Sequence, residues 1–161
     1  MEIREFKTED LEEMRVIWNQ VVDAADAFPQ EAILEGDEAE RFFGEQSFTA
    51  VAKENGEILG LYILHPNNIG RCGHLGNASY AVRKDLRGRH VGEALVRHSL
   101  KKAAELGFKV MQFNAVVASN HAAIHLYEKI GFQRLGVIPG GFRTEDGYED
   151  IMLYYIKLPE V

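Results

Sequence analysis

The chain has 161 residues and a mass of 18.2 kDa, with 46% hydrophobic and 27% charged side chains. This length predicts one domain spanning residues 1–161, and the composition excludes disordered, collagen-like and disulfide-stapled proteins. With 25 acidic against 18 basic residues, the net charge is -7. Nucleic acid and anionic membrane surfaces should therefore repel the molecule as a whole, and we expect neither as a partner.

The charge is distributed unevenly along the chain. Residues 1–40 hold thirteen acids and three bases, whereas Arg83–Lys102 hold seven bases and two acids. Such a basic stretch in an acidic protein can steer a small anionic ligand towards itself. Cys72 is the only cysteine in the sequence, which excludes an intrachain disulfide and a cysteine-rich zinc site and fits a reducing compartment. Residues 1–10 contain no long apolar run, so we expect a cytoplasmic location.

Apolar periodicity and turn-forming residues predict a strand, two helices, three strands, a helix, a strand, a helix and two final strands. The expected strands are 3–6, 48–53, 58–64, 75–82, 109–117, 132–138 and 148–158. The expected helices are 11–25, a short one from about 37, 91–106 and 122–130. This order predicts a mixed α/β domain with a largely antiparallel sheet.

Local signals support the ends of these elements. The Thr8 hydroxyl is placed to cap the first helix, and Pro29 prevents that helix from continuing. Asn55-Gly56, between two apolar runs, is the strongest short hairpin signal that a sequence offers. Gly107 and Gly131 are placed to stop the two later helices.

The most informative stretch is the junction between the strand 75–82 and the helix that begins near Val91. A strand, a glycine-containing turn and a helix aim several backbone N–H groups at one point, where the helix dipole favours phosphate. Gly88 permits an unusual backbone conformation, and Gly92 allows a ligand to approach the first helical turn closely. The junction lacks the ending of a P-loop and the three spaced glycines of a dinucleotide fingerprint, which disfavours ATP and NAD. A tight turn with solvated arginines is the alternative interpretation.

Residues 89–94, Arg-His-Val-Gly-Glu-Ala, match the signature Arg/Gln-x-x-Gly-x-Gly/Ala, and this segment resembles the GNAT acyltransferase superfamily. The resemblance implies a mostly antiparallel sheet that splays between its fourth and fifth strands, with flanking helices. It also implies that the co-substrate is acetyl-coenzyme A (acetyl-CoA), with its pyrophosphate on the backbone amides of the junction and its pantetheine arm along the strand ending at Val82. His90 departs from the glycine that many members carry. The implied coenzyme-binding residues are Val82, Arg87, Gly88, Arg89, His90, Val91, Gly92, Glu93, Ala94 and Asn120.

A second part of the resemblance lies in residues 118–132, which supply Asn120 and Tyr127. Asn120 is near a helix start, where its amide can cap the helix or, by family analogy, bind the coenzyme arm. Tyr127 follows two helical turns later, near the same face. When an amine attacks a thioester, the collapsing intermediate expels a thiolate, which a hydroxyl donor can protonate. We assign that role to Tyr127, and its alternative is a core aromatic residue with a polar handle.

The base that would accept the proton of the attacking amine is not evident. The strand 75–82 carries polar side chains but no carboxylate, and neutral amides orient ligands without acting as bases. The run 66–77, taken with Asn114 and Asn120, resembles fungal GNAT enzymes that acetylate proline analogues. This narrower resemblance implies that Asn77 and Asn114 contact the substrate or the reacting centre. Anchoring of turns and sheet bulges is the alternative for each asparagine.

Further candidates for binding the acceptor are charged. Arg71 could pair with a substrate carboxylate, and His74 could accept a proton. The tail 140–150 resembles the segment that closes the acceptor pocket in small-molecule GNAT enzymes, which makes Glu149 and Asp150 candidate amine-binding carboxylates. Solvated side chains are the alternative. We expect no metal, because His121 and His125 share a helical face without a third ligand.

The sequence therefore predicts an acetyl-CoA-dependent N-acetyltransferase that moves acetyl directly to the amine of a small molecule or amino acid. No acetyl-enzyme is expected. Two alternatives remain open at this point. One is a peptide or protein N-terminal acetyltransferase, and the other is a non-catalytic CoA-binding regulatory module. A homodimer is also left open, because no exposed stripe in the sequence identifies an interface.

Overall fold

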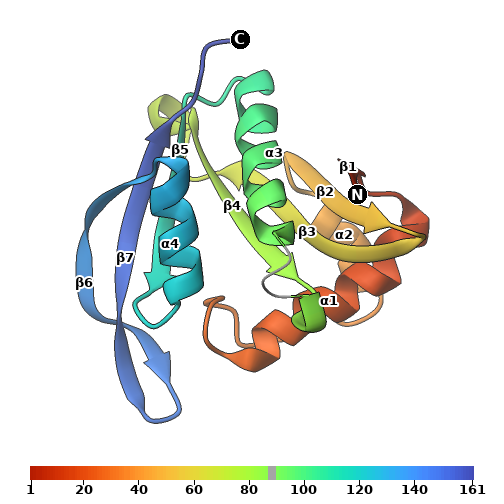
Figure 1. Ribbon diagram of the computed structural model, residues 1–161, viewed down its shortest axis with the longest axis horizontal. Helices are drawn as coiled ribbons and strands as arrows, with labels where there is room; N and C mark the ends of the chain where they lie inside the picture. The colour runs from red at the N-terminus through yellow and green to blue at the C-terminus, as the bar shows by residue number, and fades with distance from the viewer. Residues whose placement is uncertain (87–89) are drawn as a thin grey trace.

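The computed structural model describes residues 1–86 and 90–161. Within these residues one sheet has the strand order β1-β2-β3-β4-β5-β7-β6, with helices on both of its faces (Figure 1). The strands are β1 (Glu2–Glu5), β2 (Phe48–Glu54), β3 (Glu57–Pro66), β4 (Leu75–Val82), β5 (Val110–Val117), β6 (Gln133–Thr144) and β7 (Gly147–Lys157). The helices are α1 (Leu11–Ala24), α2 (Glu38–Gly44), α3 (Val91–Glu105) and α4 (His121–Ile130), with single 3₁₀ turns η1 (Thr8–Asp10), η2 (Gly70–Cys72) and η3 (Lys84–Leu86).

The sheet is antiparallel except between β4 and β5. These two strands run parallel, and they pair only where Leu75 faces Val110 and Gly76 faces Met111. Beyond Gly76 the two strands diverge, as Figure 1 shows. The mixed α/β class, the mostly antiparallel sheet and the splay between the fourth and fifth strands are therefore confirmed.

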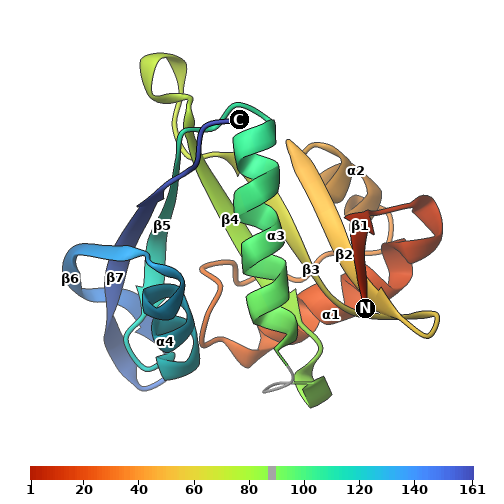
Figure 2. The ribbon, with the colours of Figure 1, turned by 45° about the horizontal axis from the view of Figure 1, so that its top comes forward.

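Two apolar layers hold the helices against the sheet. Helices α3 and α4 cover one face and α1 and α2 the other (Figure 2). The first layer is built around Leu95 and Met111, and the second around Trp18 and Phe43, all of them buried. Burial of these side chains stabilises each layer by roughly 2 kcal/mol per large side chain. Among the described residues, no helix has the length and apolar character needed to cross a membrane.

Most of the predicted turn signals act as expected. Asn55 and Gly56 have φ values of 52° and 80°, the left-handed pair that a tight β2–β3 hairpin requires. Gly107 and Gly131, with φ values of 96° and 118°, follow the ends of α3 and α4. These three predictions are confirmed.

Strand β6 is longer than the predicted 132–138. It continues through Pro139 to Thr144, and its pairing with β7 shifts between Ile138 and Phe142. Proline is tolerated at such a bulge on an edge strand because no ladder hydrogen bond is needed from its nitrogen. The sequence Pro-Gly-Gly favours a loop, which explains why the strand was predicted too short.

The prediction that Thr8 caps the first helix is wrong. Thr8 lies inside η1, and the buried carboxylate of Asp10 instead accepts hydrogen bonds from the Lys7 backbone N–H (2.8 Å), Arg4 Nη1 (2.8 Å) and Lys53 Nζ (3.3 Å). Burial by itself would raise the pKa of Asp10, but these hydrogen bonds outweigh it and hold the pKa below its ordinary value. Asp10 thus joins the start of α1 to β1 and β2.

Candidate active site

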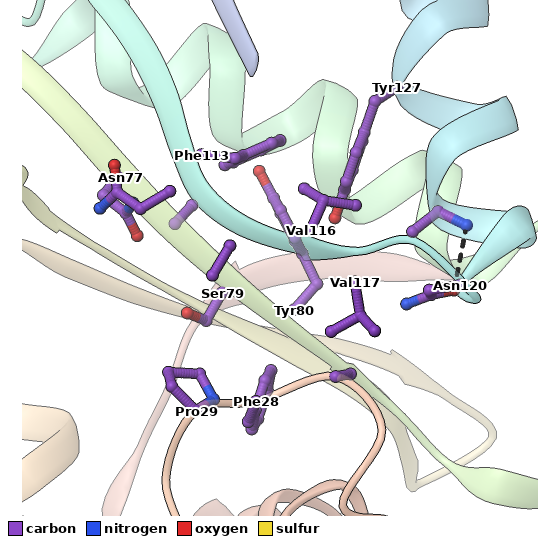
Figure 3. Close-up of a pocket in the computed structure, with 15 residues that line it drawn as sticks. Phe28, Pro29, Asn77, Ser79, Tyr80, Phe113, Val116, Val117, Asn120 and Tyr127 are labelled. Atoms are coloured by element: carbon purple, nitrogen blue, oxygen red, sulfur yellow. Dashed lines mark hydrogen bonds between the residues drawn. The ribbon is translucent and has the colours of Figure 1, made fainter. Parts of the chain in front are cut away.

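The divergence of β4 and β5 opens a cleft of about 190 Å³ (Figure 3). Both faces of the sheet contribute to it, because the wedge between the strands passes through the sheet. The lining residues come from the segment after α1, from β4, from β5 and from α4, and they are 27–29, 77–80, 113–117, Asn120, Ala123 and Tyr127. Among the described residues, no carboxylate or histidine lines this cleft.

Tyr127 reaches the cleft from α4. Its ring contacts Phe113 and Phe132, with centroid distances of 4.6 and 5.5 Å, and its hydroxyl end is directed towards Val116 (Figure 3). No described residue bonds to this hydroxyl, whereas every buried polar side-chain atom among the described residues has a partner, so the hydroxyl is not sealed inside the core. Burial of the side chain raises the pKa of Tyr127, which keeps the hydroxyl protonated at neutral pH. The group is therefore available as a hydrogen-bond donor.

The hydroxyl of Tyr80, which also lines the cleft, already has a hydrogen-bond partner. Its hydroxyl lies 2.6 Å from Ser99 Oγ, and Ser99 Oγ donates its only hydrogen to the Val96 carbonyl oxygen at 2.7 Å. Tyr80 is therefore the donor in the first bond. This bond ties β4 to α3, so the wall of the cleft and the helix that follows it are held as one unit.

Asn120 stands at the start of α4, where its Oδ1 accepts a hydrogen bond from the Ala123 backbone N–H at 3.3 Å (Figure 3). The structure thus shows the capping role that was one of two expectations for this residue. The amide also lines the cleft, and a contact with the coenzyme arm remains a prediction.

The junction before α3 is only partly described. Arg87, Gly88 and Arg89, three of the predicted phosphate-binding residues, lie outside the described residues. His90 has a φ of 61°, which explains why glycine suits this position and which costs a residue with a Cβ about 1 kcal/mol. No side chain of the described residues caps α3.

The first backbone amides of α3 differ in their bonding. The N–H groups of Val91, Gly92 and Glu93 make no hydrogen bond to a described residue, whereas the Ala94 N–H donates to the His90 carbonyl oxygen at 3.2 Å. Backbone donors at a helix start suit an anionic group. The Ala94 N–H is therefore used inside the helix and is not available to a ligand.

Two further residues define the space in front of this helix. A Cβ at Gly92 would lie 3.9 Å from the nearest atoms of Val82 and Leu126, so the described residues leave room there. Lys129 (2.8 Å) and Arg97 (3.0 Å) hydrogen-bond to the Glu93 carboxylate, which lowers its pKa and offsets the negative charge that would otherwise repel phosphate.

Strand β4 leaves one edge available along the wedge. Val82 pairs with Gly60 of β3 on its other edge, while pairing with β5 ends at Gly76. Within the described part of the chain, no backbone bond occupies the β5-facing edge between Gly76 and Val82. This edge can accept an added extended chain, as expected for the pantetheine arm.

Asn77 and Asn114 are brought together by a third asparagine. Asn67 Oδ1 accepts hydrogen bonds from Asn114 Nδ2 (2.6 Å) and Asn77 Nδ2 (3.3 Å), and Asn77 Nδ2 also donates to the Gln112 carbonyl oxygen (2.9 Å). No motif in the sequence assigns a role to Asn67. The register of the β3–β4 hairpin carries the missing signal, because the Asn67 N–H bonds to the Leu75 carbonyl oxygen at 2.7 Å and so places Asn67 beside Asn77.

The structure does not group the charged acceptor candidates with these residues. Arg71 is exposed in η2, and His74 precedes β4 at the end opposite Val82, where its carbonyl oxygen accepts from the Lys109 N–H. Asp150 Oδ1 accepts from the Gly140 N–H at 3.0 Å, and Glu149 faces Phe142 across the β6–β7 hairpin. All four side chains are absent from the cleft lining, so their roles stay predictions. In the described residues, no cluster of three or more histidine, cysteine or acidic side chains could hold a metal.

The site thus combines a splayed sheet with an unpaired strand edge, a helix start that no described side chain caps, and a tyrosine hydroxyl in the wedge. The model of the acetyltransferase (GNAT) family matches residues 9–132, and the chain belongs to this family. The N-acetyltransferase aca1 of Schizosaccharomyces pombe is 34% identical over 106 residues, which are 65% of this chain and 51% of the relative. The chain therefore spans about half the length of that curated relative.

Solved structures agree with this assignment. A GCN5-related N-acetyltransferase from Kribbella flavida has 29% identity and a TM-score of 0.90, with 98% of this chain and 97% of that chain covered. A phosphinothricin acetyltransferase from Sinorhizobium meliloti, solved in complex with acetyl-CoA, has 20% identity and a TM-score of 0.90, with 98% and 88% covered. The second likeness shows the shared fold alone.

Proposed function

We propose that this protein is an acetyl-CoA-dependent N-acetyltransferase that moves the acetyl group directly to the amine of a small molecule or amino acid. The observation that carries this proposal is the Tyr127 hydroxyl in the wedge, which no described residue binds, in a fold that also has an unpaired β4 edge and a start of α3 that no described side chain caps. Membership of the GNAT family supports the same assignment.

Two parts of acetyl-CoA, the pyrophosphate and the pantetheine arm, are assigned binding groups in this proposal. The amides of Val91–Glu93, together with Arg87, Gly88 and Arg89, would hold the pyrophosphate, and the β4 edge up to Val82 would pair with the pantetheine arm. The space in front of Gly92 would admit the phosphates. The coenzyme supplies an acetyl thioester, an acyl group with a good leaving group.

In the proposed reaction the amine nitrogen attacks the thioester carbonyl carbon, a C–N bond forms, and the C–S bond then breaks. The Tyr127 hydroxyl donates its proton to the departing sulfur, and the proton lost by the amine passes through water back to the tyrosine oxygen or to solvent. Asn77 and Asn114 would hold the amine near the reacting carbon. Asn120 keeps the start of α4 in place, so that Tyr127 faces the wedge.

Two properties of the cleft favour a small acceptor over a peptide chain. Its volume of about 190 Å³ is below the roughly 300 Å³ at which pockets for drug-sized ligands begin. Its polar lining side chains are neutral amides and hydroxyls, which can orient a small amine through a few hydrogen bonds. The alternatives are a peptide or protein N-terminal acetyltransferase and a CoA-binding regulatory module without catalysis.

Release of free thiol from acetyl-CoA, measured across a panel of amines, tests this proposal. The panel contains phosphinothricin, proline and other free amino acids, and short peptides with a free N-terminus. Turnover with phosphinothricin or a free amino acid supports the proposed function, and turnover with peptides alone supports the first alternative. Coenzyme binding by calorimetry without turnover of any amine would replace the proposal with the regulatory module.

A further inference from the structure

We propose that Asn67 is a positioning residue that, together with the Gln112 carbonyl oxygen, holds the Asn77 amide in one orientation towards the cleft. Asn77 then presents its carbonyl oxygen, an acceptor, to an N–H of the amine substrate. This inference rests on the proposed function, because it assumes an amine in the cleft. Asn67 itself is absent from the cleft lining and acts through Asn77 and Asn114.

The orientation of Asn77 follows from a backbone group. Its terminal nitrogen lies 2.9 Å from the Gln112 carbonyl oxygen, and a carbonyl oxygen can only accept a hydrogen bond. The amide group that faces Gln112 must therefore be the NH₂. The Asn77 Oδ1 is left without a partner in the described residues, and since every buried polar side-chain atom there has one, this oxygen is accessible.

Asn67 supplies the second acceptor that holds this orientation. The Asn77 NH₂ has two hydrogens, and its two acceptors are the Gln112 carbonyl oxygen and Asn67 Oδ1 at 3.3 Å. Because Asn67 Oδ1 is fixed as an acceptor, the Asn114 group at 2.6 Å must also be an NH₂. Asn114 Oδ1 then accepts from Gln112 Nε2 at 3.2 Å. One backbone carbonyl thus sets the direction of four side-chain amides in sequence, those of Asn77, Asn67, Asn114 and Gln112.

The direction of this network determines what the cleft can recognise. An N–H of a primary or secondary amine finds an acceptor in Asn77 Oδ1. A substrate carboxylate would meet an oxygen there and would be repelled, whereas the second N–H of Asn114 remains available to a carboxylate. The network therefore offers an acceptor to the amine group of an amino acid and a donor to its carboxylate.

The hydrogen bonds of Asn67 predict which of its replacements preserve the network. Only the Oδ1 of Asn67 is used, and its Nδ2 has no partner in the described part of the chain. Aspartate keeps the acceptor oxygen, whereas leucine has a similar size and removes it. A residue that merely filled space at this point of the loop would tolerate leucine better than aspartate.

Steady-state kinetics of Asn67→Asp and Asn67→Leu test the inference, using acetyl-CoA and the panel amine with the highest kcat/KM. Loss of one hydrogen-bond anchor in Asn67→Leu should lower kcat/KM for the amine about tenfold, mainly by raising KM, while the Kd for acetyl-CoA stays within about twofold. Asn67→Asp should stay within about threefold of the parent protein. Equal losses in both variants, or no loss in Asn67→Leu, would overturn the inference.

Asn68→Leu is the matched control, because Asn68 is the next residue in the same loop and its side chain bonds, among the described residues, only to the Ile69 N–H at 2.8 Å. Its kcat/KM should stay within about twofold of the parent value. Thermal unfolding of each variant identifies any that fails to fold.

A readout that needs no turnover separates this inference from the proposed function. In nitrogen–proton NMR spectra, the side-chain NH₂ signals of Asn77, assigned with Asn77→Asp, should exchange slowly with solvent in the parent protein and in Asn67→Asp. They should shift and exchange faster in Asn67→Leu. If these signals behave as expected but no panel amine is acetylated, the proposed function fails and the positioning role stands. If they do not respond to Asn67→Leu, the positioning role fails whatever the activity.

Discussion

Tyr127 carries a hydroxyl that no described residue binds, and removing that single oxygen leaves the ring contacts with Phe113 in place. We expect Tyr127→Phe to lower kcat roughly a hundredfold, because the departing sulfur loses its proton donor. The Kd for acetyl-CoA should change by less than about threefold, since the packing is preserved. Thiol-release kinetics and binding calorimetry measure the two effects. Tyr155→Phe is the matched control, because the Tyr155 hydroxyl donates to Gln133 Oε1 at 2.9 Å and Tyr155 is absent from the cleft lining, and a similar loss in both variants would contradict the assignment.

Substitutions at Gly92 distinguish an effect on coenzyme binding from an effect on folding. A Cβ there meets only ordinary contacts at 3.9 Å, so Gly92→Ala should fold normally. Gly92→Val should raise the Kd for acetyl-CoA roughly a hundredfold, because the added methyl groups occupy the space in which the phosphates approach the helix start. Calorimetry checks this result against Gly44→Val, where a Cβ meets nothing within 4 Å. Tight coenzyme binding by Gly92→Val would place the phosphates elsewhere.

At the scale of an element, α4 depends on one capping bond from Asn120 Oδ1 to the Ala123 N–H. Asn120→Ala should lower the free energy of unfolding by about 1 kcal/mol, and Asn120→Ser should restore most of it, because serine also caps helix starts. Denaturant unfolding measures both changes. If Asn120 also binds the coenzyme arm, the Kd for acetyl-CoA will rise in Asn120→Ser although the stability has returned. Equal stability of the alanine and serine variants would contradict the capping role.

The order of elements could be read from the sequence because apolar periodicity, Asn55-Gly56 and Gly107 are local signals. Two features could not be predicted in this way, since each depends on pairing between strands. Asp10 joins the start of α1 to the sheet only because β1 and β2 bring Arg4 and Lys53 to it. The extension of β6 past Pro139 depends on its pairing with β7.

The candidate site likewise combines residues that a local motif predicts with residues that only the folded chain brings together. Tyr127 and Asn120 were found through a motif on one helix, and the structure places both at the cleft. Asn67 becomes visible only when the β3–β4 register and the neighbouring β5 are known together. Arg71 and His74 are close to Asn77 in sequence, yet they precede β4 and lie beyond its paired end, so sequence distance was a poor guide to their position.

At the scale of the whole molecule, the cleft contains no carboxylate or histidine among the described residues. We therefore expect kcat/KM to rise about tenfold per pH unit below the pKa of the acceptor amine and to level off above it, because only the neutral amine attacks. Profiles for two acceptors with different amine pKa values check this expectation. A break at the same pH for both acceptors would instead indicate a titrating group of the enzyme.

Stability should also depend on pH at the alkaline end. Burial raises the pKa of Tyr62, Tyr80 and Tyr127 above the ordinary tyrosine value of 10.0. Above pH 10 the unfolded chain loses these protons before the folded protein does, so rising pH favours unfolding. Each such tyrosine steepens the fall in the free energy of unfolding by up to about 1.4 kcal/mol per pH unit. Denaturant unfolding between pH 9 and 12 should show a shallower fall for Tyr127→Phe, and identical slopes would contradict this account.

The two residue pairs that join β4 to β5 are the only ladder contacts between the N-terminal and C-terminal parts of the sheet in the described chain. A ligand that lay along the unpaired edge of β4 would act as an added strand between β4 and β5. Its binding energy would then be shared by both parts, and at a concentration of one hundred times its Kd it would add about 2.7 kcal/mol to the stability of the whole fold. The cellular supply of acyl donor would in this way set how long the protein survives proteolysis, as well as how fast it works.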